Sequence, residues 1–467
     1  MITSDTLLVH MLVLMFGSGA WIAVNGVWVE LPAIVSQAPE SWGLPAYLTV
    51  ISQFGNLGPL IVMIMQIWFS KYYNQNAMIY SITSIGTLGC LLLCFFWNST
   101  AYIGGVEHSV ALFALWFVLS FVDCSSSVTF LPFITIFPSP FLTTYFMGEG
   151  LSGLFPSIFA LAQGTGNSQC LNVSFFNETT NTTQYKIEVK YTDPRFSEAV
   201  FFGLLCIMMA LCSIAFVLLN HLPIAKRLHV TPEDKYKSGF SAEEERGTAF
   251  YHSIELEDSS NSLSDNSRSK PPEPSNGNIE ETPSHVVLNE QKKLSPTDYV
   301  YLLSIIFCIN GLSNGILPSV SSYTALPYGE VPYHLATSLG NMANPLACFI
   351  AFFLPMHSFI GIGFMAIGSA GFASYLLFLA LKSPCPVLVN ETGGAVLMVL
   401  CQILFVGCAS YVKVSIAQIF RHQGHKKSLV WYGGIVQAGS LTGALIMFPL
   451  VNVYYLFQSG IPCETCT

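Results

Sequence analysis

Long apolar stretches recur along the whole chain and are separated by short polar segments. Eleven of them are long enough to cross about 30 Å of hydrocarbon as α-helices, which takes roughly 20 residues. They lie near 8–29, 46–69, 77–97, 109–131, 141–163, 199–220, 298–320, 333–354, 359–381, 395–417 and 429–451. We therefore expect an all-α polytopic membrane protein with about eleven transmembrane helices. The first stretch is too long for a signal-peptide core and no Lys or Arg precedes it, so we expect it to remain uncleaved.

One long polar interruption divides these stretches into six and five. It is rich in Pro, Ser, Glu and Asp and has too few apolar residues to form a core, so we interpret it as a disordered cytosolic linker. The predicted organisation has four parts. They are an N-terminal six-helix bundle at 1–223 with a glycosylated outer loop (164–198), the linker at 224–296, a C-terminal five-helix bundle at 297–458 and an extracellular tail at 459–467.

Two independent signals predict the orientation. With a cytosolic N-terminus, thirteen Lys and Arg residues fall in cytosolic segments and four in outer loops, as the positive-inside rule requires. Five N-x-[ST] sequons outside the linker all fall in the predicted outer loops, at Asn98, Asn172, Asn177, Asn181 and Asn390. Both signals predict a cytosolic N-terminus and an extracellular C-terminus.

This topology places the cysteines of the outer loops and the tail on the oxidising side of the membrane. A disulfide from Cys385 to the tail, with Cys463 as the first candidate, is compatible with that side. The alternative is that these thiols are free or differently paired. No paired CxxC ligand set occurs, so we expect no metal site.

The two halves share short strings in the same order, which indicates an internal repeat. NGVWVELP at 25–32 resembles NGILP at 314–318, an offset of 289, and GNLGPL at 55–60 resembles GNMANPL at 340–346, an offset of 285. FVDCSSSVT and FVGCASYVK, and GLSG and GSLTG, follow at offsets of 284 and 289. Matched spans run in the same direction, so we expect a 6+5 parallel pseudo-repeat. This is the arrangement of major-facilitator-type carriers, which bind substrate near the bilayer midplane between halves.

Composition excludes several classes of protein. Hydrophobic residues make up 52% of the chain and charged residues 10%, against about a quarter charged in soluble proteins. The net charge of -9 and the absence of a basic face argue against a nucleic-acid partner. The motifs GxxxxGK[ST] and HExxH are absent and no catalytic set converges, so we expect neither an enzyme nor ATP-driven transport.

Polar side chains inside hydrocarbon cost a few kcal/mol each, so those that are retained should face a partner or a water-filled cavity. They supply the candidate substrate-binding residues, namely Asn25, Trp28, Gln53, Asn56, Thr129, Glu149, Asn314, Asn341, Asn344, Lys413 and Gln437. Asn25 and Trp28 are three residues apart on one helix face and offer an amide and an aromatic plane to a flat ligand. The structural alternative is an interhelical amide and a tryptophan of the interfacial belt.

Three acidic residues are candidates for proton coupling or gating, namely Glu30, Asp123 and Glu149. Asp123 and Glu149 lie deep in their spans, where removal from water favours the protonated carboxylic acid. Either could instead pair with Lys413 or serve as a structural hydrogen-bond acceptor. Glu30 lies near the outer end of its span, where simple contact with water is the leading interpretation. Lys413 lies in the cytosolic third of its span, from which its side chain could reach water.

Several strings resemble the eukaryotic riboflavin transporter family, solute carrier family 52. They are NGVWVELP, SVTFLPF, GEGLSGLFP, NGILPSV, YHLATSLGNMANPLA, SPCP, SYVKV and MFPLVNV, in this order. The resemblance runs from about residue 11 to 458 and fails only in the glycosylated loop and the linker. VDCSSSVTFLPF and GEGLSGL are most similar to the vertebrate type three members, which are associated with pH-dependent uptake.

The resemblance implies sodium-independent uptake of riboflavin at the plasma membrane by alternating access, with protons as a candidate partner. Riboflavin would be substrate and no cofactor is implied. The neutral, planar vitamin fits a site built from amides and an aromatic plane. The competing hypothesis is a carrier of another neutral heteroaromatic solute such as a nucleoside. A receptor or docking protein would leave the midplane polar residues without a purpose.

Overall fold

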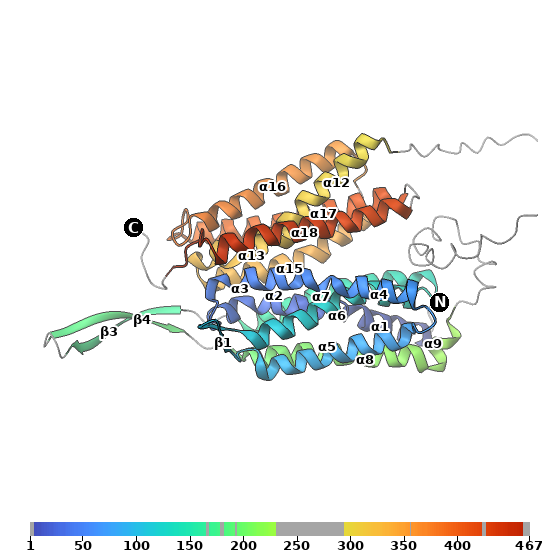
Figure 1. The fold of residues 1–467 in the computed structure, drawn as a ribbon, viewed down its shortest axis with the longest axis horizontal. Coiled ribbons are helices and arrows are strands. Elements are labelled where there is room, and N and C mark those ends of the chain that lie inside the picture. The colour runs from blue at the N-terminus through green and yellow to red at the C-terminus, as the bar shows by residue number, and fades with distance from the viewer. Residues whose placement is uncertain are drawn as a thin grey trace, which may run out of the picture.

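Helices dominate the structure, a computed structural model that describes residues 4–164, 168–177, 182–191, 194–229, 294–354, 356–422 and 426–460 (Figure 1). Most of the predicted linker, residues 230–293, lies outside the described residues, as do Asn181, Cys463 and the end of the predicted tail. The side chains of β3 and β4 and of a few helical residues, 139, 352, 421, 422 and 426–430, are likewise outside the description.

The first half of the chain forms one helical bundle, named here the N-bundle. Its helices are α1 (Ser4–Ser18), α2 (Ile22–Val35), the 3-10 turn η1 (Ser41–Gly43), α3 (Leu44–Gly55), α4 (Leu57–Trp68), α5 (Gln75–Phe96), α6 (Val110–Ile134), α7 (Ser139–Gln163), α8 (Glu198–His221) and α9 (Pro223–Arg227). Two antiparallel hairpins interrupt them, β1 (Ala101–Ile103) with β2 (Val106–His108), and β3 (Ser168–Asn177) with β4 (Thr182–Tyr191).

The second half forms the C-bundle beside it. Its elements are α12 (Pro296–Gly311), the π-helix η2 (Leu312–Ile316), α13 (Leu317–Ser319), α14 (Ser321–Ala325), the 3-10 turn η3 (Leu326–Tyr328), α15 (Glu330–Phe353), α16 (Phe359–Leu381), α17 (Thr392–His422) and α18 (Lys426–Asn452). In Figure 1 the blue-to-green N-bundle and the yellow-to-red C-bundle lie side by side, with their long helices running in roughly the same direction.

Eight helices of the described chain are long and apolar enough to cross a membrane, and a ninth span is the pair α1 and α2, bent by 54° at its break. The two remaining predicted spans correspond to α7 and α15. They have 25 and 24 residues, which gives roughly 36 Å of helix and suffices for a bilayer. Their glycines and polar side chains make them less apolar than the others, and the count of eleven spans stays a prediction.

Helix packing follows the same plan in both bundles. In the N-bundle α1 packs on α7, α3 and α4 pack on α6, and α5 packs on α6. The corresponding contacts in the C-bundle are α12 on α18, α15 on α17, and α16 on α17. These are the pairs that a duplicated unit would produce.

Glycines bring α7 into contact with α1 in the N-bundle, and α18 into contact with α12 in the C-bundle. A Cβ on Gly148 would lie 2.3 Å from the Leu14 carbonyl oxygen, and one on Gly443 would lie 2.4 Å from the Gly311 carbonyl oxygen. Neither position accommodates a side chain while the backbones stay this close. The small residues therefore set the helix separation, as is usual in membrane bundles.

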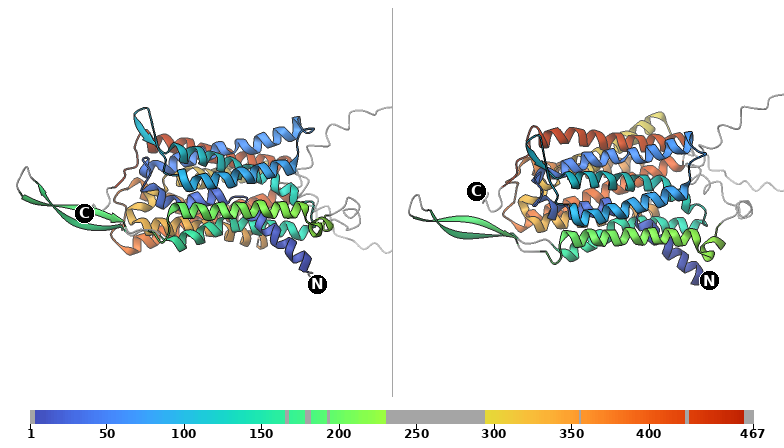
Figure 2. Two further views of the ribbon diagram at one scale, coloured as in Figure 1. Left: turned by 90° about the horizontal axis from the view of Figure 1, so that it is seen from below. Right: turned by 60° about the horizontal axis from the view of Figure 1, so that its bottom comes forward.

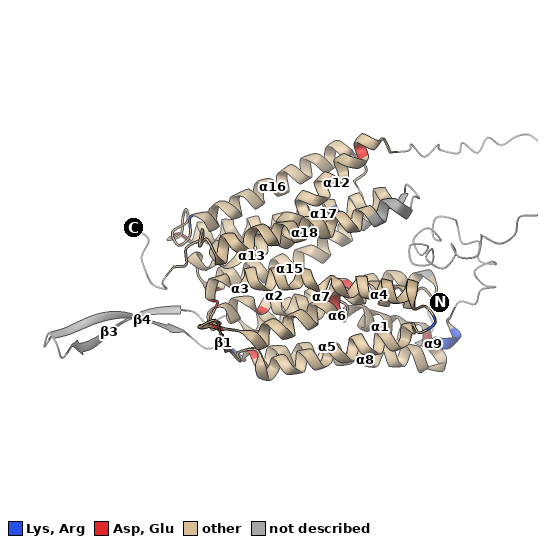
Figure 3. Ribbon diagram, viewed as in Figure 1, with Lys and Arg blue, Asp and Glu red and all other residues tan. Residues whose placement is uncertain are grey.

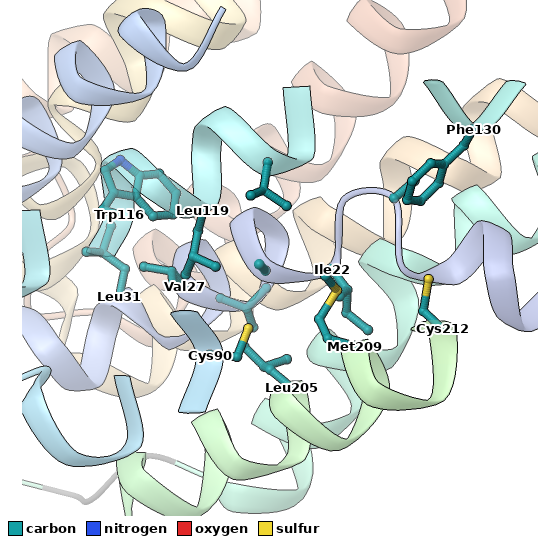
Figure 4. Close-up of a cluster of buried hydrophobic side chains, with 14 of the residues drawn as sticks. Ile22, Val27, Leu31, Cys90, Trp116, Leu119, Phe130, Leu205, Met209 and Cys212 are labelled. Carbon is teal, nitrogen blue, oxygen red and sulfur yellow. The ribbon is translucent and has the colours of Figure 1, made fainter. Parts of the chain in front are cut away.

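The N-bundle has a dense apolar core around α2. Figure 4 shows Ile22, Val27 and Leu31 of α2 facing side chains of α5, α6 and α8, among them Cys90, Trp116, Leu119, Leu205, Met209 and Cys212. All of these are buried. This packing holds α2, which carries several of the candidate polar residues, against α5, α6 and α8.

The two ends of the molecule differ. The strand hairpins extend from one end, named here the hairpin end, and α9 and the start of α1 lie at the other, the linker end (Figures 1 and 2). Gly460 lies at the hairpin end, because a Cβ there would be 3.7 Å from the Trp42 ring. Ser4 and Gly460 are therefore at opposite ends, as an odd number of crossings requires. Charged residues are sparse along the long helices (Figure 3).

The bundles touch each other near the hairpin end and at mid-height. At the hairpin end the Trp42 and Tyr323 rings are 5.7 Å apart, and the Ser322 hydroxyl donates to the Trp42 carbonyl. At mid-height α3 packs on α18 and α13. In the described part of the chain α4, which continues α3 toward the linker end, packs on α6 and has no comparable contact with the C-bundle. On the other side of the boundary α15 of the C-bundle packs on α7 and α2, so the bundles separate toward the linker end on the side of α4.

Candidate functional site

The break between α1 and α2 is satisfied by side chains of neighbouring helices. Asp123 Oδ2 accepts a hydrogen bond from the Val24 N–H at 2.8 Å, at the first turn of α2. The Ser126 hydroxyl donates to the Ala20 carbonyl at 2.9 Å, and the Cys212 thiol donates to the Phe16 carbonyl at 3.3 Å. Asp123 is fully buried. Its position matches the structural alternative, a carboxylate that caps a helix start inside the membrane.

Glu149 lies where the two bundles meet. The Trp21 indole N–H donates to its carboxylate, and Cys348 of α15 lies across the boundary within electrostatic range. Unlike Asp123, Glu149 is only partly buried. Within the described residues the ion pair of the structure is His108 with Glu40, so neither deep acid pairs with Lys413 here.

Asn25 is held in one orientation by a serine of α7. Its Nδ2 donates to Ser152 Oγ at 3.3 Å, and the Ser152 hydroxyl donates its own proton to the Glu149 carbonyl at 2.6 Å. Because that hydroxyl proton is used, Ser152 can only accept from Asn25. The nitrogen of the Asn25 amide therefore faces α7, and its oxygen faces the other way.

Asn314 has the corresponding arrangement in the C-bundle. Its Nδ2 donates to Ser440 Oγ and to Asn310 Oδ1, both at 3.2 Å. The Ser440 hydroxyl donates to the Val436 carbonyl and the Asn310 amide to the Ile306 carbonyl, each at 2.8 Å. Both partners are thus fixed as acceptors. Asn314 lies in η2, near the hairpin-end side of the span Pro296–Ser319, and its side chain is exposed.

Two further amides join the bundles, and they do so reciprocally. Gln53 Nε2 donates to the Asn314 carbonyl at 3.3 Å, and Asn341 Nδ2 donates to the Asn25 carbonyl at 3.5 Å. The acceptors Asn25 and Asn314 are 289 residues apart, which is the offset of NGVWVELP and NGILP, whereas the repeat equivalent of Asn341 is Asn56, three residues after Gln53. We name Asn25, Gln53, Asn314 and Asn341 the amide seam. It consists of two contacts, each of which joins a predicted residue of one half to a predicted residue of the other.

Lys413 is half-buried, and its ammonium is directed toward η2. Its Nζ donates to Ser313 Oγ at 3.3 Å, and the Ser313 hydroxyl donates to Asn314 Oδ1 at 3.3 Å. Its neighbour on α17, Ser410, donates to Asn344 Oδ1 at 2.6 Å. Lys413 and Asn344 therefore flank the seam on the C-bundle side.

The remaining predicted residues are placed differently. Thr129 is fully buried and its hydroxyl bonds within α6, to the Ser125 carbonyl at 3.0 Å. Trp28 packs edge-to-face on Trp116 with ring centroids 5.7 Å apart. Asn56 joins α3 to α4 and Gln437 is exposed on α18. Asn56 contacts the amide seam through its backbone N–H, which donates to the Gln53 carbonyl at 3.3 Å, and in the described structure the side chains of these four residues form no hydrogen bond with the seam.

The expectation that Glu30 meets water is wrong. Its side chain is 2% exposed, and Gln163 Nε2 donates to its carboxylate at 2.9 Å. Glu30 lies at the outer end of its predicted span, next to a predicted outer loop, which is why contact with water was expected. Instead α7 extends to Gln163, which covers the Glu30 side chain. Its role as a gate stays a prediction.

Sequence reasoning missed the residues that orient the amides, Ser152 and Ser440, and the indole donor Trp21. Ser152 and Ser440 lie in the repeated strings GLSG and GSLTG, so the repeat contained the signal. The weak hydropathy of a serine gave no reason to single them out.

The predicted modifications lie near the hairpin end where they are described. Asn98 and Asn390 are exposed. Asn172 and Asn177 lie in β3, with side chains outside the description. Cys385 is disulfide-bonded, whereas nine other cysteines of the described chain are free thiols. The pairing with Cys463 falls outside the described residues and stays a prediction.

Comparison with known proteins gives a specific likeness over nearly the whole chain. Residues 5–459 match the family model described as solute carrier family 52, riboflavin transporter. The chain is 44% identical to riboflavin transporter 2 of Salmo salar over 99% of this chain and 100% of that protein. It is 43% identical to riboflavin transporter member 3-B of Danio rerio, covering 98% and 99% of the two chains. With member 3 of Homo sapiens the identity is 38%, over 98% of both chains.

Solved structures share the fold at low sequence identity. A bacterial homologue of the human lysosomal transporter Spinster, inward-facing and unoccupied, aligns with a TM-score of 0.53 at 12% identity, over 95% of this chain and 82% of that one. A D-xylose-proton symporter aligns with a TM-score of 0.52 at 11% identity, over 97% and 92%. These likenesses show a helical transporter fold of the major-facilitator kind.

Proposed function

Since this chain belongs to the riboflavin transporters of solute carrier family 52, we propose that it takes up riboflavin across the plasma membrane by alternating access. Members of this family are transporters and not enzymes, and the chain has the apolar helices of a multi-pass membrane protein. The observation that carries the mechanism is the amide seam, in which polar groups of both bundles meet at the middle of long apolar helices.

We propose that the structure represents one end state of the transport cycle. Contacts between the bundles at the hairpin end and at the seam, together with their divergence beyond α3, support a site that opens toward the linker end. With the predicted cytosolic N-terminus and eleven spans, this is an inward-open state. Riboflavin would enter from outside when the hairpin-end contacts break and the two bundles close at the linker end.

The matching helix pairs of the two bundles support a 6+5 repeat as the basis of this motion. Two units with like packing can rock about the boundary where they meet, and that boundary is the seam. Because Asn25 and Asn314 occupy equivalent positions on opposite sides, each bundle can offer the substrate the same kind of contact. Glu149 and Trp28 would complete the site from the N-bundle, and Lys413 and Asn344 from the C-bundle.

We propose Glu149 for the proton-linked role. It is only partly buried and faces the boundary, so a proton can reach it in one state and leave in another. Asp123 is fully enclosed and bonded to the backbone of α2, which supports a structural role. Glu30 is buried and bonded to Gln163 near the hairpin end. As a gate residue it would hold α2 and α7 together on that side of the membrane.

Uptake of radiolabelled riboflavin into cells that express the chain tests the substrate. We expect uptake that excess unlabelled riboflavin blocks, that excess uridine leaves unchanged, and that persists when choline replaces sodium. Stronger inhibition by uridine than by riboflavin would support a nucleoside carrier instead. No flavin-specific uptake in cells that display the chain at their surface would reject the proposal.

A further inference from the structure

The amide of Asn314 is fixed so that its oxygen alone is available to a ligand. Both N–H groups of Nδ2 are used, one by Ser440 Oγ and one by Asn310 Oδ1. Neither partner can turn round, because the Ser440 hydroxyl and the Asn310 amide are each bonded to a backbone carbonyl of their own helix. A backbone carbonyl can only accept a hydrogen bond. Ser440 and Asn310 must therefore donate to their backbone carbonyls and accept from Asn314.

The oxygen of this amide keeps an accepting site. Oδ1 receives one hydrogen bond from the Ser313 hydroxyl, which in turn receives one from the Lys413 ammonium. An amide oxygen has two lone pairs, so one remains. The side chain is exposed, and the backbone carbonyl of Asn314 meets Gln53, which lies midway along the apolar span Ser41–Trp68. An exposed acceptor of fixed direction at this depth is costly unless a ligand or water pairs with it.

A fixed acceptor selects one kind of ligand group. A hydroxyl can donate or accept, so the ribityl hydroxyls of riboflavin would be tolerated by an amide of either orientation. The imide N–H of the isoalloxazine ring, by contrast, can only donate. It is the one group of the vitamin that requires an acceptor of this fixed direction.

We infer that Asn314 Oδ1 is the specificity-determining acceptor for the imide N–H of the flavin ring, held in that orientation by Asn310 and Ser440. The inference rests on the proposed function and names the contact by which the site recognises its substrate. Asn25, whose nitrogen donates one hydrogen bond to Ser152, would turn its oxygen from the N-bundle toward the hydroxyl-bearing part of the ligand.

The test compares riboflavin with 3-methylriboflavin, in which a methyl group replaces the imide hydrogen. Both compounds compete for radiolabelled riboflavin bound to membranes that contain the full-length protein. For the unmodified protein we expect 3-methylriboflavin to be weaker by roughly tenfold or more, as when a buried polar group of a site loses its partner. Equal competition by the two compounds would overturn the inference.

The variant Asn314→Leu removes the acceptor. We expect the preference for riboflavin over 3-methylriboflavin to fall to about one, because neither compound then has an acceptor to lose. The matched control is Asn76→Ala, which removes another interhelical amide, bonded to Asn220 at 3.3 Å between α5 and α8. The control should keep the full preference, and an Asn314→Leu protein that also keeps it would overturn the inference.

A double variant protects the test against misfolding. Asn314→Leu alone leaves Asn310 Oδ1 without its donor, whereas Asn310→Leu with Asn314→Leu removes both partners and leaves no orphaned group in that pair. The same loss of preference is expected, and a retained preference counts against the inference. If the unmodified protein takes up no riboflavin, the proposed function itself fails. If it takes up riboflavin and the variants still discriminate, only the inference fails.

Discussion

At the residue scale, Asp123 stabilises the start of α2. Without it, a backbone N–H of the first turn would lack a hydrogen-bond partner inside the membrane. Its carboxylate accepts the Val24 N–H at 2.8 Å, and the residue is fully buried. We expect Asp123→Ala to lower the free energy of unfolding by about 1–2 kcal/mol, the usual cost of losing a helix cap. Asp123→Asn keeps an acceptor oxygen and should cost less.

Thermal unfolding of the two purified variants in one detergent measures this difference. Equal losses for Asp123→Ala and Asp123→Asn would mean that the negative charge, and not the accepting oxygen, is what the break requires.

Glu149 is the residue at which pH dependence should appear. Replacement by Gln keeps the size of the side chain but removes the proton that it can carry. We expect Glu149→Gln to flatten the riboflavin uptake profile between about pH 5.5 and 8, since a bell or slope in such a profile reports an essential ionisable group.

The control for this measurement is Asp123→Asn, which should keep the shape of the pH profile even if uptake falls. A Glu149→Gln protein with the same profile as the unmodified protein would remove the proton role from this residue.

Much of the seam could be predicted from residue types alone. Asn25, Gln53, Asn314 and Asn341 were identifiable because an amide is costly in hydrocarbon and because they recur near one sequence offset. Thr129 met the same criterion, but a threonine on a helix can satisfy its hydroxyl at its own backbone, as it does here with Ser125. Polarity in a span therefore predicts a partner, but not whether that partner lies across the boundary.

At the scale of elements, the close contacts α1–α7 and α12–α18 depend on glycine. A Cβ on Gly443 would lie 2.4 Å from the Gly311 carbonyl oxygen. We expect Gly443→Val to destabilise the protein by about 1–3 kcal/mol, as overpacking does in tightly packed interiors. Yield at the cell surface and unfolding temperature in detergent both measure this.

Gly371→Ala on α16 is the matched control, because a Cβ there would have no neighbour within 4 Å. It should unfold like the unmodified protein. If Gly443→Val is equally stable, α12 and α18 are farther apart than the structure shows.

The sequence predicted nearly all long helices, because apolar stretches of this length have few alternatives in a membrane. It did not predict the break between α1 and α2 or the π-helix η2. Both have partners far along the chain: Asp123 and Ser126 bond the backbone at the break, and Gln53 bonds the Asn314 carbonyl in η2. Local propensity contains no information about such partners.

At the scale of the whole molecule, the contacts at the hairpin end should separate during each transport cycle. Trp42 and Ser322 meet there across the two bundles. We expect Trp42→Cys combined with Ser322→Cys, joined by a short thiol-specific cross-linker, to lose uptake of riboflavin while membranes still bind the vitamin from the linker side.

Each single-cysteine variant treated with the same reagent is the control and should keep its uptake. A cross-linked double variant with normal uptake would show that the hairpin end need not open, which contradicts rocking of the bundles about the amide seam.

The most direct measurement of alternating access by a riboflavin carrier is counterflow in liposomes that contain the purified protein. Vesicles loaded with unlabelled riboflavin and diluted into trace labelled riboflavin should accumulate label transiently above its external concentration, and vesicles loaded with uridine should not. Label that merely equilibrates, at the same rate with either internal solute, would contradict the account.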